Sequence, residues 1–306
     1  MGAELAVVTG GAGFIGSHLV EALRSQGDAV RVVDNFPTGR RSLVPAGVEL
    51  LEGDVNDVAL KAVRGASVVY HLAALPSVPR SVKQPLESHR ATAQGTLAVL
   101  AAAEQARVRR VVVASSSSVY GDTPTLPKHE GMAPNPLSPY AAAKLASERY
   151  AQSWAARGGI ETVSLRFFNV YGPRQDPDSP YAAVIPIFLR KLKEGAALPV
   201  FGDGGQTRDF TFVEDAVLAT MAALTRPAPE FAYNVGGGHR VALAEVLDRI
   251  ERLVGRPIER RHVEPQRGDP RDTAADTALA RRDLGYEPRT SLEQGLSRQW
   301  EWQRNI

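Results

Sequence analysis

A run of glycines between an apolar strand and an amphipathic helix restricts the fold of this chain more than any other feature. The segment VVTGGAGFIGSHLVEAL, residues 7–23, places Gly10, Gly11, Gly13 and Gly16 at the junction. Glycines at this spacing allow a tight turn and close approach of the backbone to a pyrophosphate, which then lies at the N-terminus of the helix. Because the glycines follow a strand and precede a helix, the segment predicts a dinucleotide-binding turn rather than a purely structural one.

An acidic residue at the end of the second predicted strand indicates which dinucleotide is bound. Asp34 follows Val32 and Val33 and lies 18 residues after Gly16. A carboxylate at this place binds the 2′-hydroxyl of the adenosine ribose and repels a 2′-phosphate, which favours NAD over NADP. The nearby Arg40 and Arg41 keep NADP open as an alternative.

Short apolar segments alternate with longer helical patterns through the first half of the chain. The short segments are rich in valine, as is typical of strands buried on both faces of a parallel sheet. Strands are predicted over residues 5–9, 29–33, 48–52, 67–72, 109–114 and 161–166, and helices over residues 14–26, 57–64, 85–106 and 139–158. This alternation predicts an α/β fold with a Rossmann-type, doubly wound parallel sheet.

The pattern loosens after about residue 170. Proline and glycine cluster at 172–180 and 199–205, and short helices are predicted over residues 184–194, 243–254 and 291–302. We expect an NAD-binding Rossmann domain over residues 1–170 and a smaller C-terminal α/β region over residues 171–306. The segment 209–240 is expected to rejoin the main sheet.

Composition excludes several classes of function. The 36 basic and 34 acidic residues leave a net charge of +2, which gives no reason to expect a nucleic acid or membrane partner. The chain has no cysteine, so disulfides and thiolate metal sites are excluded, and its six histidines lack the spacing of metal ligands. Because no signal-peptide pattern and no apolar stretch of about 20 residues occurs, we expect a cytoplasmic protein.

A tyrosine and a lysine four residues apart are candidates for proton transfer. In LSPYAAAKLASERY, Ser138 is a suitable N-cap and Pro139 a suitable first helical residue, so Tyr140 and Lys144 project from one face of the same helix. A phenol of ordinary pKa about 10 is a poor base at neutral pH. A neighbouring ammonium group and a positively charged nicotinamide ring would lower that pKa.

At this point the chain resembles a known family almost from end to end, the extended short-chain dehydrogenase/reductases. Within that family it is most similar to the nucleotide-sugar 4-epimerases, of the type acting on UDP-glucose or UDP-N-acetylglucosamine. Eight ordered motifs carry the resemblance: TGGAGFIGSH (9–18), GDV (53–55), HLAA (71–74), SSSSVYGD (115–122), SPYAAAK (138–144), LRFFNVYGPRQDP (165–177), AAVIPIF (182–188) and FGDGGQTRDFTFVEDA (201–216).

The resemblance implies roles for particular residues. Tyr140 would be the acid/base, Ser116 would hold the reacting sugar oxygen, and Lys144 would bind the nicotinamide ribose and tune Tyr140. A tightly bound NAD is implied at Gly10, Gly13, Phe14, Ile15, Gly16, Asp34, Asn35, Asp54, Val55, Leu72, Ala73, Ala74, Ser115, Tyr140, Lys144 and Phe167. A UDP-sugar is implied at Ser77, Ser116, Ser117, Asn169, Val184, Phe188, Arg208, Asp269 and Thr273.

The residues after Ser116 indicate the type of reaction. The resemblance implies that the sugar 4-hydroxyl is oxidised first, with its proton passing to Tyr140 and the hydride passing to NAD. Dehydratases and decarboxylases of this group look like the same strand followed by acidic residues, whereas this chain has Ser117 and Ser118. Rotation of the 4-keto sugar and return of the hydride then gives 4-epimerisation, with 4,6-dehydration or decarboxylation as a weaker alternative.

The sugar itself is less constrained. Glucuronate 4-epimerases resemble GPRQRPD, with an arginine where this chain has Asp176, so a neutral hexose is favoured unless Arg80 or Arg174 compensates. UDP-glucuronate therefore stays an alternative. Thr273 falls at the family's size-limiting position and is small enough to admit a 2-acetamido group. UDP-glucose/UDP-galactose is the expected substrate pair, with UDP-GlcNAc/UDP-GalNAc second.

Three further points complete the sequence-based expectations. A family arginine expected at position 266 is glutamine here, and whether Arg267 replaces it is open. The alanine-rich helical segments 85–106 and 139–158 either are simply buried beside the sheet or form a helix-to-helix dimer interface, and the family resemblance implies the second, a homodimer. A non-catalytic, dinucleotide-binding regulator is the alternative from another class, and the intact Ser116, Tyr140 and Lys144 count against it.

Overall fold

A seven-stranded parallel sheet forms the centre of the computed structural model, which describes residues 4–226, 228, 229, 231–264 and 270–306. Its strand order is β11-β6-β5-β4-β1-β2-β3, and every neighbouring pair runs parallel. The strands are β1 (Leu5–Thr9), β2 (Ala29–Asp34), β3 (Glu49–Glu52), β4 (Val68–His71), β5 (Arg110–Ser116), β6 (Glu161–Phe167) and β11 (Ala232–Val235). The predicted Rossmann-type doubly wound sheet is thereby confirmed.

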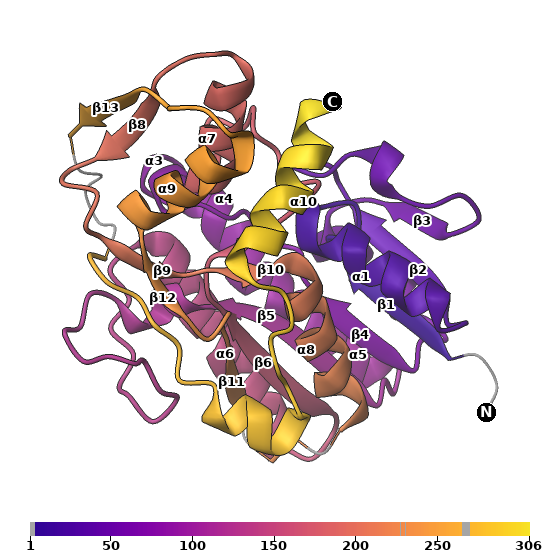
Figure 1. The fold of residues 1–306 in the computed structure, drawn as a ribbon. Helices are drawn as coiled ribbons and strands as arrows, with labels where there is room; N and C mark the ends of the chain where they lie inside the picture. Colours follow the sequence, from indigo (N-terminus) through magenta and orange to yellow (C-terminus); the bar gives the residue numbers. More distant parts are fainter. Residues whose placement is uncertain (1–3, 227, 230, 265–269) are drawn as a thin grey trace.

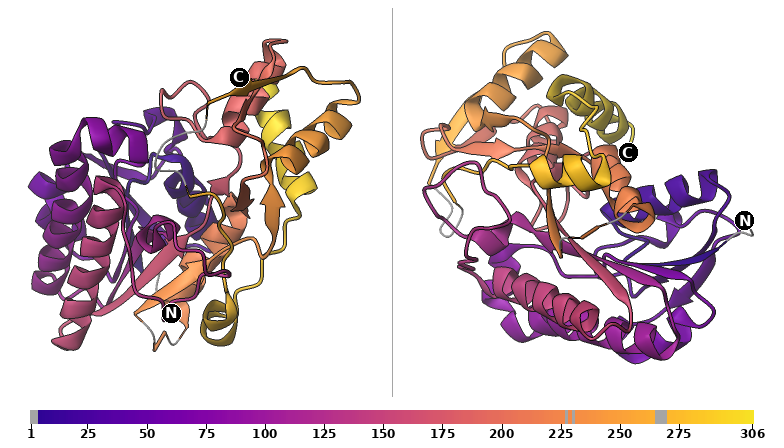
Figure 2. Two further views of the ribbon diagram at one scale, coloured as in Figure 1. Left: turned by 90° about the vertical axis from the view of Figure 1, so that its left-hand side faces the viewer. Right: turned by 90° about the horizontal axis from the view of Figure 1, so that it is seen from below.

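Helices cover both faces of the sheet, which explains why its central strands are apolar on both sides. One face is covered by α1 (Phe14–Ser25), α8 (Val213–Thr225) and the turn η4 (Ala280–Leu284). The other face is covered by α2 (Val55–Val63), α5 (Gly95–Gln105) and α6 (Pro139–Ala156). The left panel of Figure 2 shows the purple and magenta helices stacked along one side of the sheet.

The segment between β4 and β5 differs from the single helix predicted over residues 85–106. It contains α3 (Val78–Lys83), α4 (Pro85–His89), a π-helical turn η2 (Arg90–Gln94) and α5. The π turn widens the helix locally and changes the direction in which its following side chains point. Among the residues described, no helix is both long and apolar enough to cross a membrane.

The C-terminal region packs over one end of the sheet and has its own apolar core. Apart from the segment that joins the main sheet, its described residues form helices and short two-stranded ladders, and its core includes Phe188, Leu189, Val246, Leu247 and Leu296. The helices are α7 (Val184–Lys193), α9 (Leu243–Val254) and α10 (Leu292–Arg304). The ladders pair β7 (Val170–Tyr171) with β10 (Thr211–Phe212), β8 (Leu198–Phe201) with β13 (Arg260–Val263), and β9 (Thr207–Asp209) with β12 (Arg240–Ala242). Two short 3₁₀ turns, η1 (Arg41–Leu43) and η3 (Ser117–Tyr120), complete the structure.

The part of the C-terminal half expected to return to the main sheet does so through one strand. β11 pairs in parallel with β6, from Ala232 opposite Ser164 to Val235 opposite Phe167. Helix α8 leads to it across the face of the sheet that α1 covers. The core of the sheet therefore includes residues from both halves of the chain.

Candidate active site

A cavity of about 850 Å³ lies at the carboxyl end of the sheet, between the sheet and the C-terminal region. The loops after β1, β2, β4, β5 and β6 all contribute to its wall. In an open parallel sheet this edge is where ligands bind, next to the point where the strand order reverses. Here the order reverses at β1, because the next strand along the chain, β2, lies on one side of it and β4 on the other.

The glycine turn places backbone without side chains at the wall of this cavity. Gly10 has a φ of +72°, and a Cβ at Gly10 would lie 2.8 Å from the backbone nitrogen of Ala73. A Cβ at Gly16 would lie 2.1 Å from the carbonyl oxygen of Gly10. Helix α1 begins after Gly13, whose position supplies no side-chain cap. The first amide groups of α1 therefore have no capping side chain in front of them at the wall of the cavity.

Asp34 lies at the end of β2 with its carboxylate already oriented. Its Oδ2 accepts a hydrogen bond from the amide of Ala12 at 3.0 Å, and its Oδ1 accepts one from the amide of Phe36 at 2.8 Å. Burial raises the pKa of Asp34, and these amide groups oppose the rise. The hydrogen bonds hold the carboxylate against the glycine turn at the adenosine end of the cavity.

Arg40 and Arg41, which made NADP an alternative cofactor in the sequence, are both paired with carboxylates. Arg40 donates to Asp176 at 3.0 Å, and Arg41 forms an ion pair with Glu52. A 2′-phosphate at Asp34 would meet its carboxylate and would have to compete with Asp176 and Glu52 for the arginines. The arrangement around Asp34 therefore favours NAD.

Strand β5 ends in serines whose side chains go to different places. The hydroxyl of Ser115 donates to Glu148 at 2.5 Å and is buried. The oxygen of Ser116 lies at the cavity and accepts a hydrogen bond from the amide of Ser118 at 3.2 Å. The strand was predicted to end at residue 114, but it continues through Ser116, so Ser117 and Ser118 begin the turn η3.

Tyr140, Lys144 and Ser116 meet at one place in the cavity. The ammonium of Lys144 lies 5.9 Å from the centre of the Tyr140 ring and donates to the carbonyl of Ala114 at 2.6 Å. Burial raises the pKa of Tyr140 to about 12, and a hydrogen bond with Ser116 partly offsets this rise. Burial lowers the pKa of Lys144 to about 8, and the negative charge of Glu148 partly offsets this fall.

The sequence-predicted cofactor residues all contribute to the wall of this cavity. Asp54 also caps α2, because its side chain accepts a hydrogen bond from the amide of Asn56 at 2.9 Å. The residues of this set that line the cavity are Gly10, Gly13, Phe14, Ile15, Gly16, Asp34, Asn35, Asp54, Val55, Leu72, Ala73, Ala74, Ser115, Tyr140, Lys144 and Phe167. They lie along the sheet edge from the glycine turn to the end of β6.

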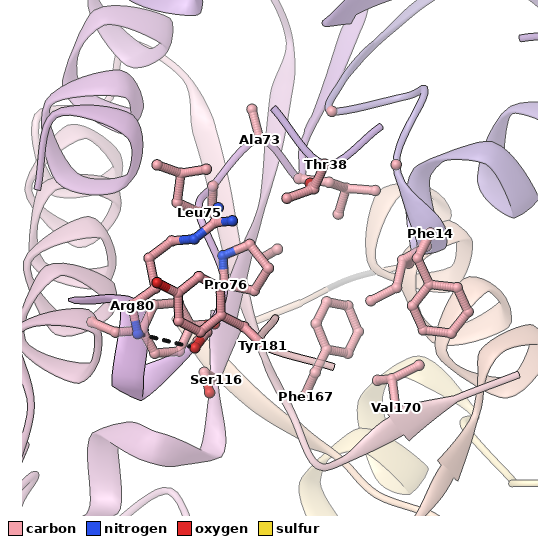
Figure 3. Close-up of a pocket in the computed structure, with 18 of the residues that line it drawn as sticks. Phe14, Thr38, Ala73, Leu75, Pro76, Arg80, Ser116, Phe167, Val170 and Tyr181 are labelled. Carbon is pink, nitrogen blue, oxygen red and sulfur yellow. Dashed lines mark hydrogen bonds between the residues drawn. The ribbon is translucent and has the colours of Figure 1, made fainter. Parts of the chain in front are cut away.

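Three predicted substrate residues gather on the side of the cavity formed by the C-terminal region. Asn169, Arg208 and Thr273 all line it, and the hydroxyl of Thr273 lies 3.4 Å from the side-chain oxygen of Asn169. Asn169 and Arg208 also line an adjoining hollow of about 200 Å³, which Val184 reaches from the start of α7. Figure 3 shows Phe14, Phe167 and Val170 at the same opening.

Two predicted substrate residues differ in placement from the rest. Phe188 is completely buried in the C-terminal core and lines neither the cavity nor the hollow, because it lies one turn after Val184 on the inner face of α7. The structure therefore does not bring Phe188 to the site. Asp269, together with Gln266 and Arg267, lies outside the described residues.

Ser77 and Ser117 line the cavity near Tyr181, a residue that the sequence motifs did not single out. Ser77 caps α3 by accepting a hydrogen bond from the amide of Arg80 at 3.2 Å, with a φ of +107°. The guanidinium of Arg80 lies 4.8 Å from the centre of the Tyr181 ring, and Figure 3 shows the two side chains together over the cavity. Such cation–π contacts hold Tyr181, and with it the segment after β7, against α3.

Lys128 is a second cavity residue that sequence reasoning missed. Its side chain is almost fully buried and its ammonium donates to the carbonyl and hydroxyl oxygens of Thr123. Its backbone pairs with Ala274 and Asp276, more than 140 residues further along the chain. No local pattern marks this pairing, because it depends on how the C-terminal segment folds back.

The comparisons with known proteins agree with this geometry. A family model described as the NAD dependent epimerase/dehydratase family matches residues 6–236. The chain belongs to this family. Within the described part of the chain, no group of three or more histidine or acidic side chains is arranged to hold a metal ion.

Several relatives match almost the whole chain. A UDP-glucose 4-epimerase of Mycolicibacterium smegmatis is 37% identical over 308 residues, covering 98% of both chains. The crystal structure of a UDP-glucose 4-epimerase from Thermotoga maritima with UDP-glucose has a TM-score of 0.95 at 33% identity and covers 98% of this chain and 99% of that one. MoeE5 in complex with UDP-glucuronic acid and NAD has a TM-score of 0.89 at 42% identity, with 98% and 99% covered.

The residues of this member of the family fit NAD as its cofactor. The contact between Gly10 and Ala73 would not tolerate a Cβ, and the same holds for Gly16 against Gly10, so a cradle of bare backbone lies at the start of α1. Asp34 is held at the place where a ribose hydroxyl would bind. Tyr140 and Lys144 lie at the other end of the same edge, where the nicotinamide would lie.

Proposed function

We propose that this protein is a UDP-sugar 4-epimerase that retains its NAD through the reaction. The observation that carries the proposal is the meeting of Ser116, Tyr140 and Lys144 inside a cavity that also holds the dinucleotide cradle. Its relatives with the same family membership act on UDP-sugars, which supports the substrate class.

The protein's own residues supply proton transfer and orientation. Ser116 donates a hydrogen bond to the 4-oxygen of the sugar, and Tyr140 removes the proton from that hydroxyl and later returns one. Because burial holds the pKa of Tyr140 near 12, the ammonium of Lys144 is needed to stabilise the phenolate. When bound, the cofactor supplies a hydride acceptor at carbon 4 that also gives the hydride back.

The residues at the end of β5 favour epimerisation over elimination. Dehydration or decarboxylation needs a further acid or base beside the sugar, and Ser117 and Ser118 offer only hydroxyls there. Because Ser117 and Ser118 provide no acid or base at the end of β5, the 4-keto sugar has one productive fate in this proposal. It turns over in the cavity and is reduced from its other face.

For the sugar itself we propose a neutral hexose, UDP-glucose or UDP-galactose. Thr273 is small and lies beside Asn169, so the proposal extends to sugars with a 2-acetamido group, UDP-GlcNAc and UDP-GalNAc.

One observation favours UDP-glucuronate as a second candidate. Asp176, which would repel a sugar carboxylate, forms an ion pair with Arg40, so much of its charge is compensated. Arg80 also lines the cavity and presents a guanidinium that a carboxylate could reach. MoeE5, which is similar along almost its whole length, was crystallised with UDP-glucuronic acid and also with UDP-glucose, so its pocket holds both kinds of sugar.

Separate incubations with UDP-glucose, UDP-GlcNAc and UDP-glucuronate test the proposal. We expect one or more of them to be converted to its 4-epimer, detected by NMR of the anomeric proton, without added NAD. Tyr140→Phe should lower the rate by about 10³-fold, because it removes the proton-transfer group. Tyr150→Phe, on the same helix but outside the cavity, is the matched control and should leave the rate within about twofold of wild type.

Other outcomes would overturn it. No conversion of any of the three sugars by folded, NAD-loaded protein contradicts an epimerase. A stable 4-keto sugar or release of CO2 points instead to a dehydratase or a decarboxylase.

A further inference from the structure

A third ionisable residue follows Tyr140 and Lys144 on the same face of α6. Glu148 lies one helical turn beyond Lys144, and its side chain is completely buried. A carboxylate is rarely buried in this way unless it is paired. The mechanism proposed above gives Glu148 no role.

Glu148 is held by an arginine from the neighbouring strand. The Nε of Arg166 donates to Oε1 of Glu148 at 2.8 Å, and a terminal nitrogen donates to Oε2 at 2.7 Å. The other terminal nitrogen donates to the hydroxyl of Tyr120 at 2.9 Å. A two-point pair of this kind fixes the plane of the carboxylate, so Glu148 cannot turn away from the strand it faces.

Three consecutive residues at the end of β5 bind three residues of α6. The carbonyl of Ala114 accepts from Lys144, and the hydroxyl of Ser116 shares a hydrogen bond with Tyr140. Between them the hydroxyl of Ser115 donates to Glu148. Glu148 therefore supports Ser115, which lies between the strand residues that contact Lys144 and Tyr140.

The ionisable groups that face Lys144 come from two elements. Tyr140 and Glu148 lie on its own helix, and His71 faces it from β4. Burial lowers the pKa of His71 to about 3, so the ring is neutral near pH 7. Arg166 on β6 lies behind Glu148, and Thr96 on α5 donates a hydrogen bond to Ser147 on α6. Among these described groups, Glu148 supplies the negative charge that favours a protonated Lys144.

We propose that Glu148 is a positioning residue for the reaction, which keeps Lys144 protonated and holds the end of β5 against α6, with Arg166 fixing its orientation. The inference depends on the proposed function, in which Lys144 and Tyr140 take part in the reaction. Lys144 acts on Tyr140 only as an ammonium, so a change at Glu148 reaches Tyr140 through Lys144. Glu148 itself touches neither substrate nor cofactor in this scheme.

The titration of Lys144 can be followed directly, without any assay of activity. The chain contains six lysines, so protein made with ¹³C-labelled lysine has a simple spectrum, and Lys144→Arg identifies the signal of Lys144. We expect Glu148→Gln to lower the midpoint of this signal by about one pH unit, because a nearby negative charge is lost. The alkaline limb of the rate profile should move in the same direction by a similar amount.

Two further variants separate charge from packing. Ser115→Ala removes the hydrogen bond to Glu148 but keeps its charge, so it should leave the midpoint of Lys144 in place even where the rate falls. Glu104→Gln is the matched control, because Glu104 pairs with Arg157 on the surface, away from the cavity. It should change neither the midpoint nor the rate.

The outcomes decide between a positioning and a merely structural role. An unchanged Lys144 midpoint in folded Glu148→Gln overturns the inference, even if the variant is less stable. Should that variant fail to fold, Glu148→Gln/Arg166→Gln keeps a hydrogen-bonded neutral pair, and a midpoint equal to that of the wild type then overturns it. If no UDP-sugar reacts but the midpoint moves, the proposed function fails while the link between Glu148 and Lys144 stands.

Discussion

At the scale of single residues, side chains of the same type have different roles at the site. Tyr140 is partly buried, and desolvation raises its pKa as it raises that of the fully buried Tyr120. What distinguishes Tyr140 is an ammonium and a serine hydroxyl close to it. Chemistry at this site depends on the neighbours of a residue more than on its type.

Asp34 carries a residue-scale prediction about the cofactor. Asp34→Asn leaves one acceptor oxygen where two amide groups now donate, and it removes the charge that repels a 2′-phosphate. We expect NAD binding to weaken by about tenfold, equal to about 1.4 kcal/mol, and the preference over NADP to shrink. Titration calorimetry with each dinucleotide checks this.

Asp28→Asn, which lies before β2 and outside the cavity, serves as the comparison and should bind NAD as the wild type does. An unchanged preference in Asp34→Asn would show that another residue discriminates between the two dinucleotides.

At the scale of elements, a buried histidine ties two strands to two helices. The ring of His71 on β4 lies 2.7 Å from the hydroxyl of Thr9 on β1 and 3.1 Å from that of Thr96 on α5. Thr96 in turn donates to Ser147 on α6 at 2.9 Å. The chain of hydroxyls joins the strands that carry the glycine turn to the helix that carries Tyr140.

This histidine predicts how stability depends on pH. The pKa of His71 falls to about 3 in the folded protein, against about 6.5 in an unfolded chain. Between these two values only the unfolded state takes up the proton, so the free energy of unfolding should drop by about 1.4 kcal/mol per pH unit as the pH falls from about 6.5. Urea unfolding from pH 7 to pH 4 measures the slope.

His71→Gln should reduce the slope of the unfolding free energy against pH by about 1.4 kcal/mol per pH unit, which corresponds to one proton, although it lowers stability at pH 7. His129→Gln, at an exposed histidine, should leave the slope unchanged. Equal slopes in the wild type and His71→Gln would contradict a neutral, buried His71.

The sequence predicted elements well where their pattern is local. Strands β1 and β2 and helix α1 lie within one residue of their expected bounds, because valine-rich runs and the glycine turn mark them. Helix α8 was not foreseen, since its small apolar residues show little periodicity. The ladder of β8 with β13 joins segments about 60 residues apart, so its pairing depends on the tertiary fold.

The same distinction holds for the site. Gly10, Ser116, Tyr140 and Lys144 belong to short motifs, and the structure brings all four to one cavity. The pairs Arg80–Tyr181 and Arg40–Asp176 join segments that meet only in the folded chain, the second across 136 residues. The sequence singles out Arg40, Arg80 and Asp176 one at a time, but no local pattern shows which residue each of them pairs with.

At the scale of the whole molecule, the C-terminal region is joined to the sheet by continuous packing. Ile15 and Val170 contact both the core of the sheet and the C-terminal core. On α10, a Cβ at Gly295 would lie 2.0 Å from the hydroxyl of Tyr171, so this helix rests directly on β7. His18 on α1 lies 3.0 Å from the carbonyl of Pro173.

This packing predicts that the protein unfolds in one cooperative transition. The chain has three tryptophans, with Trp154 on α6 and Trp300 and Trp302 on α10. Variants that keep only Trp154, or only the α10 pair, should show the same urea midpoint within about 0.2 M, because neither region keeps its core without the other. Two separate fluorescence midpoints would mean that the regions unfold independently.

The four serines at the end of β5 and the start of η3, Ser115 to Ser118, affect which changes in this chain can be tolerated. Successive side chains of a strand point to opposite faces, so Ser115 reaches Glu148 while Ser116 reaches the cavity. A slip of one residue that moved Ser116 and Ser117 into the places of Ser115 and Ser116 would exchange the two faces, yet a serine would again stand at each place. The position of a serine along the backbone therefore decides its role. Because the neighbouring residues are also serines, such a shift would still place a hydroxyl beside Glu148 and another at the cavity.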